Sequence, residues 1–330
     1  MRPMALGICA GFRDQRSRLC ALALALFVGV SSSVAQQSAP AQRQFAPGVM
    51  TTIAPEMEPA EIVSTHDLIE VRANPGAKWS PELIADSRTL HGMSEGVKFR
   101  RDAWCLEFSF KPLRMIHVEV PQADGTFERK LIWYLVYSVR NTGETLTPVA
   151  GEDGIVTAQP GRGEAIRFVP SFVLESQDRS ATGEPIRIAY LDRVIPAAMA
   201  AIQAREAGGR TLLTSTQMAA QPIPVSAGPG DGRVWGVATW EDVDPRLDFF
   251  SVYVGGLSNA YRWTDPEGGY SAGDPPGTGR EFARKTLQLN FWRPGDEHFE
   301  SEGEVRFGVA RGKSGLYGVP EGVAYRWVYR

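Results

Sequence analysis

The sequence predicts a mainly β protein, an antiparallel β-sandwich with one or two short helices, and an immunoglobulin-like arrangement is one version of that sandwich. Three observations predict this class. Apolar and polar residues alternate in most segments after residue 100, which is the period of a half-buried strand. Clusters of Gly, Pro and Asp separate these segments, as turns separate antiparallel strands. Strands do not alternate with long helices, and no repeat of about 20–50 residues recurs, which disfavours doubly wound folds, propellers and solenoids.

The first 35 residues have the pattern of a secretory signal peptide. Four arginines precede an apolar run of twelve residues from Leu19 to Val30, and small residues at Ser33 and Ala35 mark a cleavage site before Gln36. The run is too short to span a bilayer, which needs a helix of about 20 apolar residues. We therefore expect an exported protein in the periplasm, at the cell surface or in the medium, with no transmembrane segment in the mature chain.

Removal of this leader changes the charge and the cysteine content. The full chain has 35 basic and 38 acidic side chains, the leader holds four and one of them, and cleavage leaves 31 and 37, a net charge of −6. An acidic chain without a basic block argues against nucleic acid as a partner. Cys9 and Cys20 leave with the leader, so Cys105 has no intramolecular disulfide partner and is interpreted as a small buried hydrophobe.

The chain divides into a leader, a linker and a folded region. Residues 36–60 are rich in Ala, Pro and Gln, which predicts a flexible linker. The β-sandwich region then runs over residues 61–330. It forms either one large domain or two, and the Gly-rich segment 151–163 is the best boundary if there are two.

The best-determined element is a hairpin around Asp124-Gly125, a dipeptide typical of tight turns. Strands with alternating apolar residues are predicted before it, over 104–110 and 115–120. The strand that returns over 131–139 is apolar on both faces, which predicts a central strand covered on both sides. The segment Tyr137-Ser138-Val139-Arg140-Asn141-Thr142-Gly143 resembles a strand and turn of bacterial immunoglobulin-like modules, and this resemblance implies an immunoglobulin-like strand there.

Further elements follow the same rules. Strands are predicted over residues 234–240, 249–254, 286–292, 304–309 and 323–329. A short helix is predicted from Ser80-Pro81-Glu82 to Ser87, with serine as the N-cap and proline at the first helical position. A clearer helix runs from Pro196 to Ala207, because its interior is rich in alanine and Gly208-Gly209 follows it. Met199 and Ile202 are expected to form its buried stripe.

The densest group of carboxylates is an acidic loop formed by Glu241, Asp242, Asp244 and Asp248 around Pro245. Oxygen ligands along one loop suit Ca²⁺, which prefers about six to eight of them. The spacing differs from that of an EF-hand, and a solvated turn that begins at Asp244-Pro245 is the favoured interpretation. Calcium binding stays the alternative, and Ca²⁺ is the one cofactor that the sequence suggests.

Aromatic residues give the one ligand-like signal. Tyr261 and Trp263 share a strand face, and Tyr325, Trp327 and Tyr329 share another at the C-terminus. Flat aromatic faces on a β-sandwich stack on sugar rings, which makes these five residues candidates for ligand binding. Filling of the core is the competing and favoured interpretation, since Trp and Tyr each bury about 150–250 Å² there.

No motif in the sequence fixes a catalytic activity. The four histidines are not paired at metal-ligand spacing, and the chain lacks a GxSxG elbow and an SxxK motif. We therefore expect a non-catalytic β-sandwich protein with a binding or structural role in the cell envelope, with an envelope protein or a glycan as partner. The alternative is a carbohydrate-binding or glycan-active protein that uses exposed aromatic residues.

Overall fold

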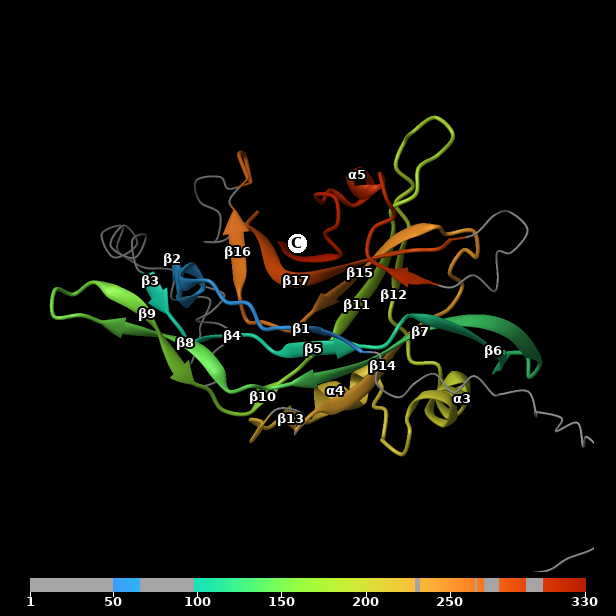
Figure 1. The fold of residues 1–330 in the computed structure, drawn as a ribbon, viewed down its shortest axis with the longest axis horizontal. Coiled ribbons are helices and arrows are strands. Elements are labelled where there is room, and N and C mark those ends of the chain that lie inside the picture. Colours follow the sequence, from blue (N-terminus) through green and yellow to red (C-terminus); the bar gives the residue numbers. More distant parts are fainter. Residues whose placement is uncertain (1–49, 66–97, 229–231, 265, 270–278, 295–304) are drawn as a thin grey trace, which may run out of the picture. The chain divides into compact units, whose positions relative to one another are not determined.

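The computed structural model describes part of the chain, the rest of which is drawn in grey in Figure 1. The described residues are 50–65, 98–228, 232–264, 266–269, 279–294 and 305–330. The predicted signal peptide and the helix predicted at 80–87 lie outside them. Within the described residues the protein is mainly β with antiparallel sheets, as the sequence predicts.

A first sheet is built around one long strand, β7 (Phe127–Arg140). One edge of β7 pairs with β14, and the other edge pairs with β5 near its end and with β6 nearer its start. The strand β1 extends the sheet beyond β5. The bounds of these partners are β1 (Thr51–Ile53), β5 (Glu107–Phe110), β6 (Arg114–Pro121) and β14 (Val234–Trp240).

A second sheet is built around β17 (Glu281–Trp292). Strands β15 and β16 follow one edge of β17, while β18 and β19 follow the other. Strands β11 and β12 continue the sheet beyond β15. The bounds are β11 (Ser171–Ser176), β12 (Ala189–Leu191), β15 (Phe249–Gly255), β16 (Tyr261–Thr264), β18 (Arg306–Phe307) and β19 (Tyr325–Tyr329).

Smaller elements surround the two sheets. Three helices and one 3-10 helix are described: α3 (Pro196–Glu206), α4 (Ser215–Ala220), α5 (Ser314–Tyr317) and η1 (Pro59–Ile62). The short sheets pair β2 (Val63–Thr65) with β3 (Lys98–Arg100), β10 (Ile166–Arg167) with β13 (Pro222–Ile223), and β4 (Ala103–Trp104) with β8 (Glu144–Ala150) and β9 (Val156–Arg162). None of the helices in the described residues has the length and hydropathy that a membrane-spanning helix requires.

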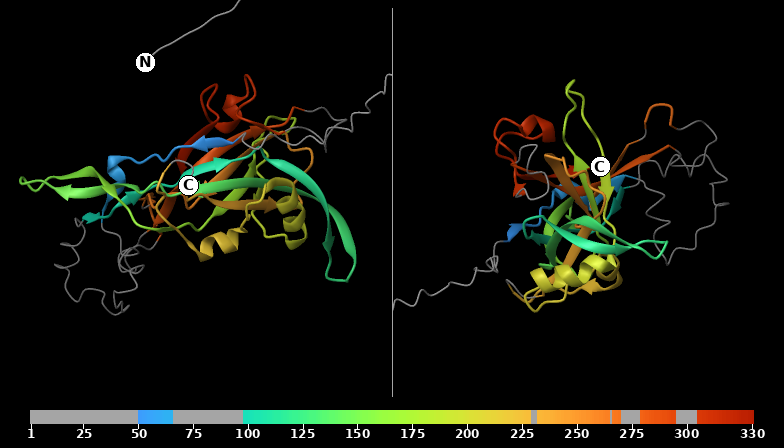
Figure 2. Two further views of the ribbon diagram at one scale, coloured as in Figure 1. Left: turned by 60° about the horizontal axis from the view of Figure 1, so that its bottom comes forward. Right: turned by 90° about the vertical axis from the view of Figure 1, so that its right-hand side faces the viewer.

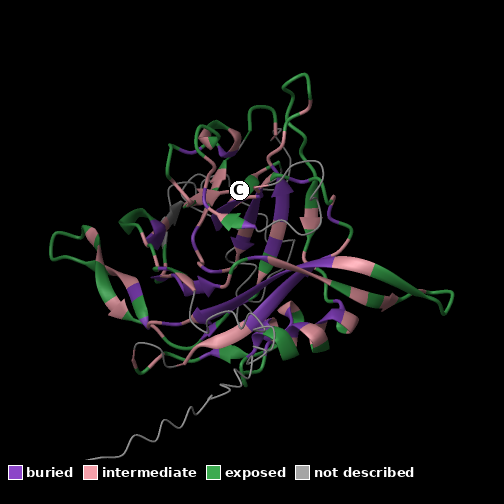
Figure 3. Cartoon of the chain, turned by 45° about the vertical axis from the view of Figure 1, so that its right-hand side comes forward, coloured by how far each residue is buried: buried purple, intermediate pink, exposed green. Residues whose placement is uncertain are grey.

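The main core takes side chains from both large sheets. Phe108 and Tyr137 of the first sheet contact Phe172 of the second, with ring centroids 6.3 and 4.8 Å from it. Trp133 meets Phe250 edge to face at 5.4 Å. Figure 3 shows the buried strands in purple. Aromatic pairs of this kind add to the free energy gained by burying their area.

Both faces of β7 are buried, which confirms its predicted central position. Trp133, Leu135 and Tyr137 join the core shared with the second sheet. The alternate residues Ile132 and Tyr134 enter a second apolar cluster on the opposite face. Because successive side chains of a strand point to opposite faces, a strand that is apolar at every position must be covered twice.

The predicted hairpin is confirmed. Strands β6 and β7 pair from Arg114 opposite Tyr134 to Pro121 opposite Phe127. Gly125 takes a φ of 83°, which a residue without a side chain adopts at no steric cost. The carboxylate of Asp124 accepts hydrogen bonds from the backbone N–H and the hydroxyl of Thr126, and these bonds stabilise the turn.

Helix α3 covers the outer face of the first sheet and nearly matches its predicted bounds (Figure 2). Ile202 is fully buried there, and Met199 packs partly against the same cluster. The helix ends at Glu206, whose side chain accepts hydrogen bonds from Lys111, Arg114 and Tyr134 at 3.3, 2.8 and 2.9 Å. These contacts fasten the end of α3 to β6 and β7.

Replacing Glu206 by glutamine should make stability less dependent on pH in acid. Burial by itself raises the pKa of Glu206, but the charge of Arg114 and the hydrogen bonds from Tyr134 and Lys111 outweigh it and lower the pKa below the ordinary 4.5. A lowered folded-state pKa gives stability that is present above the unfolded pKa and is lost as pH falls through the folded one. Glu206→Gln should cost about 1–3 kcal/mol at pH 7 in urea unfolding, with the difference from the parent shrinking below pH 4.5.

The control for this prediction is Glu128→Gln, since Glu128 is exposed and its carboxylate lies 3.9 Å from Nζ of Lys130. It should change stability by less than about 0.5 kcal/mol at either pH. An unchanged stability of Glu206→Gln at pH 7 would contradict the role assigned to Glu206.

Strands lie within two segments that the sequence singles out, the predicted linker at 36–60 and the possible domain boundary at 151–163. Residues 51–53, within the predicted 36–60 linker, form β1 because Ile53 enters the core beside β5. The Gly-rich segment 151–163 forms a turn and strand β9, which pairs with β8 along its whole length. Residues Ala46–Arg330 form one compact unit.

Cys105 is buried, which agrees with its interpretation as a small hydrophobe. Burial raises the pKa of its thiol to about 11. A thiol that stays protonated at neutral pH is a poor nucleophile and a poor metal ligand.

Candidate functional site

The second sheet has a polar face on the side opposite the core. Along β15, Phe250, Val252 and Val254 enter the core, so Ser251 and Tyr253 point to the other face. Two adjoining hollows lie on that outer face, and we call them together the outer groove. They adjoin because Tyr253 and Arg330 line both.

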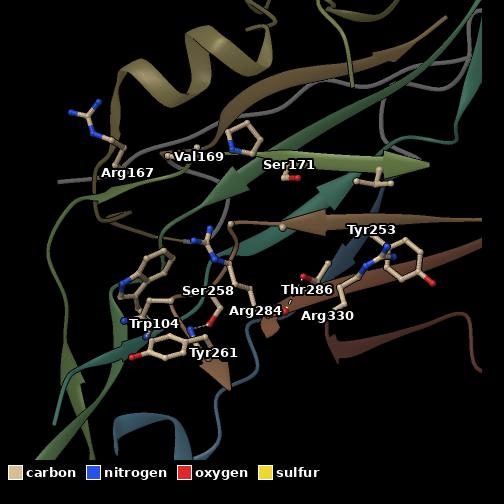
Figure 4. A pocket seen from close by; sticks show the side chains of 16 residues that line it. Trp104, Arg167, Val169, Ser171, Tyr253, Ser258, Tyr261, Arg284, Thr286 and Arg330 are labelled. Carbon is tan, nitrogen blue, oxygen red and sulfur yellow. Dashed lines mark hydrogen bonds between the residues drawn. The ribbon is translucent and has the colours of Figure 1, made fainter. Parts of the chain in front are cut away.

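The larger hollow has a volume of about 590 Å³ and is drawn in Figure 4. Its lining comes from β11, β15, β16 and β17 and from the segment 256–260. The lining includes Trp104, Ser171, Tyr253, Tyr261, Arg284 and Arg330. The smaller hollow, of about 400 Å³, adds Glu175, Arg187, Gln288 and Arg326.

A buried polar network supports the floor of the groove. Gln288 on β17 donates to Asn290 at 2.9 Å and accepts from Nε of Arg326 on β19 at 2.8 Å. Arg326 also donates to the carbonyl of Gly318, just after α5. Each of these polar groups has a partner, so the floor is rigid. A rigid floor is the condition for holding a ligand in one orientation.

Two arginines lie directly opposite each other in the groove. Arg284 on β17 and Arg330 after β19 exchange backbone hydrogen bonds of 2.8 and 3.2 Å, which places their side chains on the same face. Like charges directly opposite across strands destabilise a sheet. Arg330 is balanced by Glu175 at 2.9 Å, and its guanidinium lies 3.9 Å from the ring centroid of Tyr253. The side chain of Arg284 is exposed and has no partner among the described residues.

Aromatic side chains close one end of the groove. Figure 4 shows Trp104 and Tyr261 near Arg284 at that end, with Tyr253 and Arg330 at the other and Thr286 between them. The backbone N–H of Trp104 donates to Asn259 at 3.0 Å. Tyr261 lies under the guanidinium of Arg101, 4.0 Å from its ring centroid. These contacts hold the backbone of Trp104 and the ring of Tyr261 in place on neighbouring elements.

The wall beside these rings depends on Gly256. Its φ is 87°, and a Cβ added there would lie 2.2 Å from the carbonyl oxygen of Val169. Both residues line the larger hollow. Only glycine allows the two backbones to approach this closely.

The structure separates the five aromatic residues that the sequence singles out. Tyr261 lines the groove. Trp263 lines neither hollow, and the guanidinium carbon of Arg280 lies 3.7 Å from the centroid of its ring. Tyr325, Trp327 and Tyr329 lie on the face of β19 opposite to Arg326 and Arg330. Trp327 packs against the main core, and the hydroxyl of Tyr329 donates to Glu61 at 2.8 Å.

The groove arginines and Trp104 were not predicted. The sequence does carry a signal for two of them, since Arg326 and Arg330 alternate along the last strand with Trp327 and Tyr329. In a strand that alternates aromatic and basic residues, the aromatic side chains face a core and the basic side chains face solvent or an anion. That signal does not identify Arg284, which becomes part of the site through the pairing of β17 with Tyr261 on one edge and Arg330 on the other.

The four carboxylates of the acidic loop lie apart from the groove and mostly contact basic residues. Glu241 pairs with Arg193, Asp242 with Lys130 at 3.0 Å, and Asp244 with Arg246 at 3.1 Å. The backbone N–H of Asp248 donates to Asp178. Asp242 takes a φ of 56°, a conformation typical of turns. The described residues contain no group of three or more His, Cys, Asp or Glu arranged to hold a metal, and calcium binding stays a prediction.

The chain matches no known family model, no curated protein and no solved structure at a significant level. The lining contains no His, Cys or Asp, and its one carboxylate, Glu175, is bound to Arg330. Arginine forks, aromatic faces and hydroxyls hold a ligand without transferring a proton to it.

Proposed function

We propose that this chain is an exported, non-catalytic β-sandwich protein with a binding role in the cell envelope, and that the outer groove is its ligand site. The core to which both large sheets contribute supports the sandwich. The leader pattern of residues 1–35 supports export.

The groove is the observation that carries the proposal. Its larger hollow of about 590 Å³ lies within the usual size of a small-molecule site. Its floor is a hydrogen-bonded sheet, and its lining combines aromatic rings with an arginine, Arg284, that no described side chain neutralises. Convergent polar groups of this kind in a preformed hollow are what distinguish a ligand site from a surface irregularity.

Binding without catalysis fits the lining best. General acid–base catalysis needs a group that exchanges a proton near neutral pH. Burial and the neighbouring Glu175 raise the pKa of Tyr253 above its ordinary value, so its hydroxyl stays neutral. Arginine keeps its proton at any physiological pH.

The proposal is tested by filling the groove. Ser171 is exposed on its wall, so Ser171→Trp should occupy the space while leaving the core intact. The mature protein is screened by thermal shift against sugars, peptides and lipids. A ligand at 100 times its dissociation constant stabilises a protein by about 2.7 kcal/mol. Any compound that stabilises the parent protein should lose at least about tenfold in affinity for Ser171→Trp.

The control is Thr182→Trp, which adds the same ring at an exposed turn outside the groove. It should bind as the parent does. A screen without a hit in any class, or hits that Ser171→Trp leaves unchanged, would contradict the ligand site. Conversion of a bound compound to product would contradict the non-catalytic part.

A further inference from the structure

The outer groove is basic in an acidic protein. The full chain has a net charge of −3. Among the side chains that line the two hollows, five are arginines and one is acidic, Glu175; the arginines are Arg167, Arg187, Arg284, Arg326 and Arg330. Tyr253 and Tyr261 are the other titratable side chains in the lining. A local excess of one sign against the sign of the whole surface attracts a ligand of opposite charge.

Four of the five arginines already have partners, and one of them, Arg187, lies 3.8 Å from a carboxylate oxygen of Glu175. Arg326 is held by Gln288 and the carbonyls of Tyr317 and Gly318. Arg167 donates to the carbonyls of Ala219 and Ala220 at the end of α4. Arg330 pairs with Glu175.

Arg284 is different. Its guanidinium has no partner among the described residues, although its neighbour across the strands is a second arginine. An anion at this point would give the guanidinium of Arg284 a partner that the described residues do not supply.

The neighbours of Arg284 indicate what carries the anion. Trp104 and Tyr261 lie beside it at one end of the groove (Figure 4). Aromatic faces offer a large contact area to an apolar ring face at a low cost in conformational entropy. Hydroxyls of Ser171 and Thr286 line the same hollow and suit the polar edge of a sugar. A planar guanidinium matches the two oxygens of a carboxylate.

We propose that the outer groove binds an acidic glycan, with a sugar ring against Trp104 and Tyr261 and its carboxylate on Arg284. The proposal rests on the groove being the ligand site and names the class of ligand that it takes. Arg330 lies at the other end of the groove, where it is paired with Glu175, so Arg284 is the guanidinium left to bind the carboxylate. Binding should weaken as salt rises, because part of it is electrostatic.

The test compares two sugars that differ only in charge. Oligogalacturonate carries a carboxylate on each ring, and its methyl ester keeps the ring and loses the charge. Calorimetric titration of the mature protein should show binding of the acid form and at least tenfold weaker binding of the ester. Arg284→Met should weaken binding of the acid form by about 10- to 100-fold, the usual effect of losing a charged hydrogen bond. Arg284→Lys, which keeps the charge without the fork, should fall between the two.

The control for the charge change is Arg129→Met, an exposed arginine of the β6–β7 hairpin. It should bind as the parent does, and circular dichroism should show all variants folded. Equal binding of acid and ester, with loss of both in Ser171→Trp, would overturn the acidic class while leaving the ligand site standing. Absence of binding to either sugar, or binding that Arg284→Met leaves unchanged, would overturn the inference. The proposed function would then be tested separately by the thermal-shift screen against sugars, peptides and lipids.

Discussion

Replacing Lys285 by methionine should destabilise the protein by about 3–5 kcal/mol, the usual result of breaking a buried ion pair from one side. Lys285 lies on β17 and its side chain is 1% exposed; that of its partner Glu61 is 3% exposed. Nζ of Lys285 donates to Glu61 at 2.6 Å and to the carbonyl of Glu56 at 2.7 Å. The pair joins the segment around η1 to the second sheet.

The effect is large because the charge left behind has little to stabilise it. Without Lys285, the carboxylate of Glu61 keeps one hydrogen bond, from Tyr329. Its second oxygen is buried and has no hydrogen-bond partner among the described residues. An isolated carboxylate in such a place either takes up a proton or forces the local structure to open. Both routes cost stability at neutral pH.

Urea unfolding at pH 7 measures this loss, and a double variant separates its cause. Lys285→Met combined with Glu61→Leu removes both charges and should recover most of the lost stability. Arg246→Met, which breaks the exposed pair with Asp244, should cost less than about 1 kcal/mol. A double variant as unstable as Lys285→Met alone would show that packing, and not the unpaired charge, causes the loss.

Replacing Gly256 by alanine should destabilise the protein and deform the groove. A residue other than glycine at a φ of 87° is strained by about 1–3 kcal/mol. The added Cβ would also overlap the carbonyl oxygen of Val169, 2.2 Å away, which belongs to the backbone and cannot rotate aside. The wall between Gly256 and Val169 must therefore move outward.

The matched control is Gly183→Ala. Gly183 has a φ of 86°, and nothing lies within 4 Å of the position its Cβ would take, so this variant reports the backbone strain alone. Urea unfolding measures the loss of stability in each variant, and the difference between the two losses isolates the overlap with Val169. We expect Gly256→Ala to lose about 1–3 kcal/mol more than Gly183→Ala. Equal losses of stability in Gly256→Ala and Gly183→Ala would show that the backbone at Val169 moves aside without any loss of stability.

The sequence predicts strands well where one short segment contains the whole pattern. The strand predicted over 234–240 matches β14, and those at 249–254, 286–292, 304–309 and 323–329 each overlap a strand. Helix α3 is also confirmed, because proline begins it and glycines follow it. The β1 strand is missed because its three residues carry no period of their own and gain their order from pairing with β5.

The candidate site is harder to predict because pairing between distant strands creates it. Trp104, Arg284 and Arg330 are separated by long stretches of sequence, and none stands in a motif. Alternation along a strand identifies aromatic residues on a common face but not which face is exposed. That choice included Tyr261 in the groove and also Trp327, which packs against the core.

The Lys285–Glu61 pair also bears on when the protein can fold. Glu61 lies near the start of the described chain, and its partners Lys285 and Tyr329 lie 224 and 268 residues later. Contacts between such distant segments form slowly, because a long loop must close before they contribute any stability. If the proposed export proceeds with the N-terminus first, this contact can form only after β17 and β19 have crossed the membrane. The late formation of this contact would keep the chain unfolded during export, and a narrow secretion channel admits an unfolded chain.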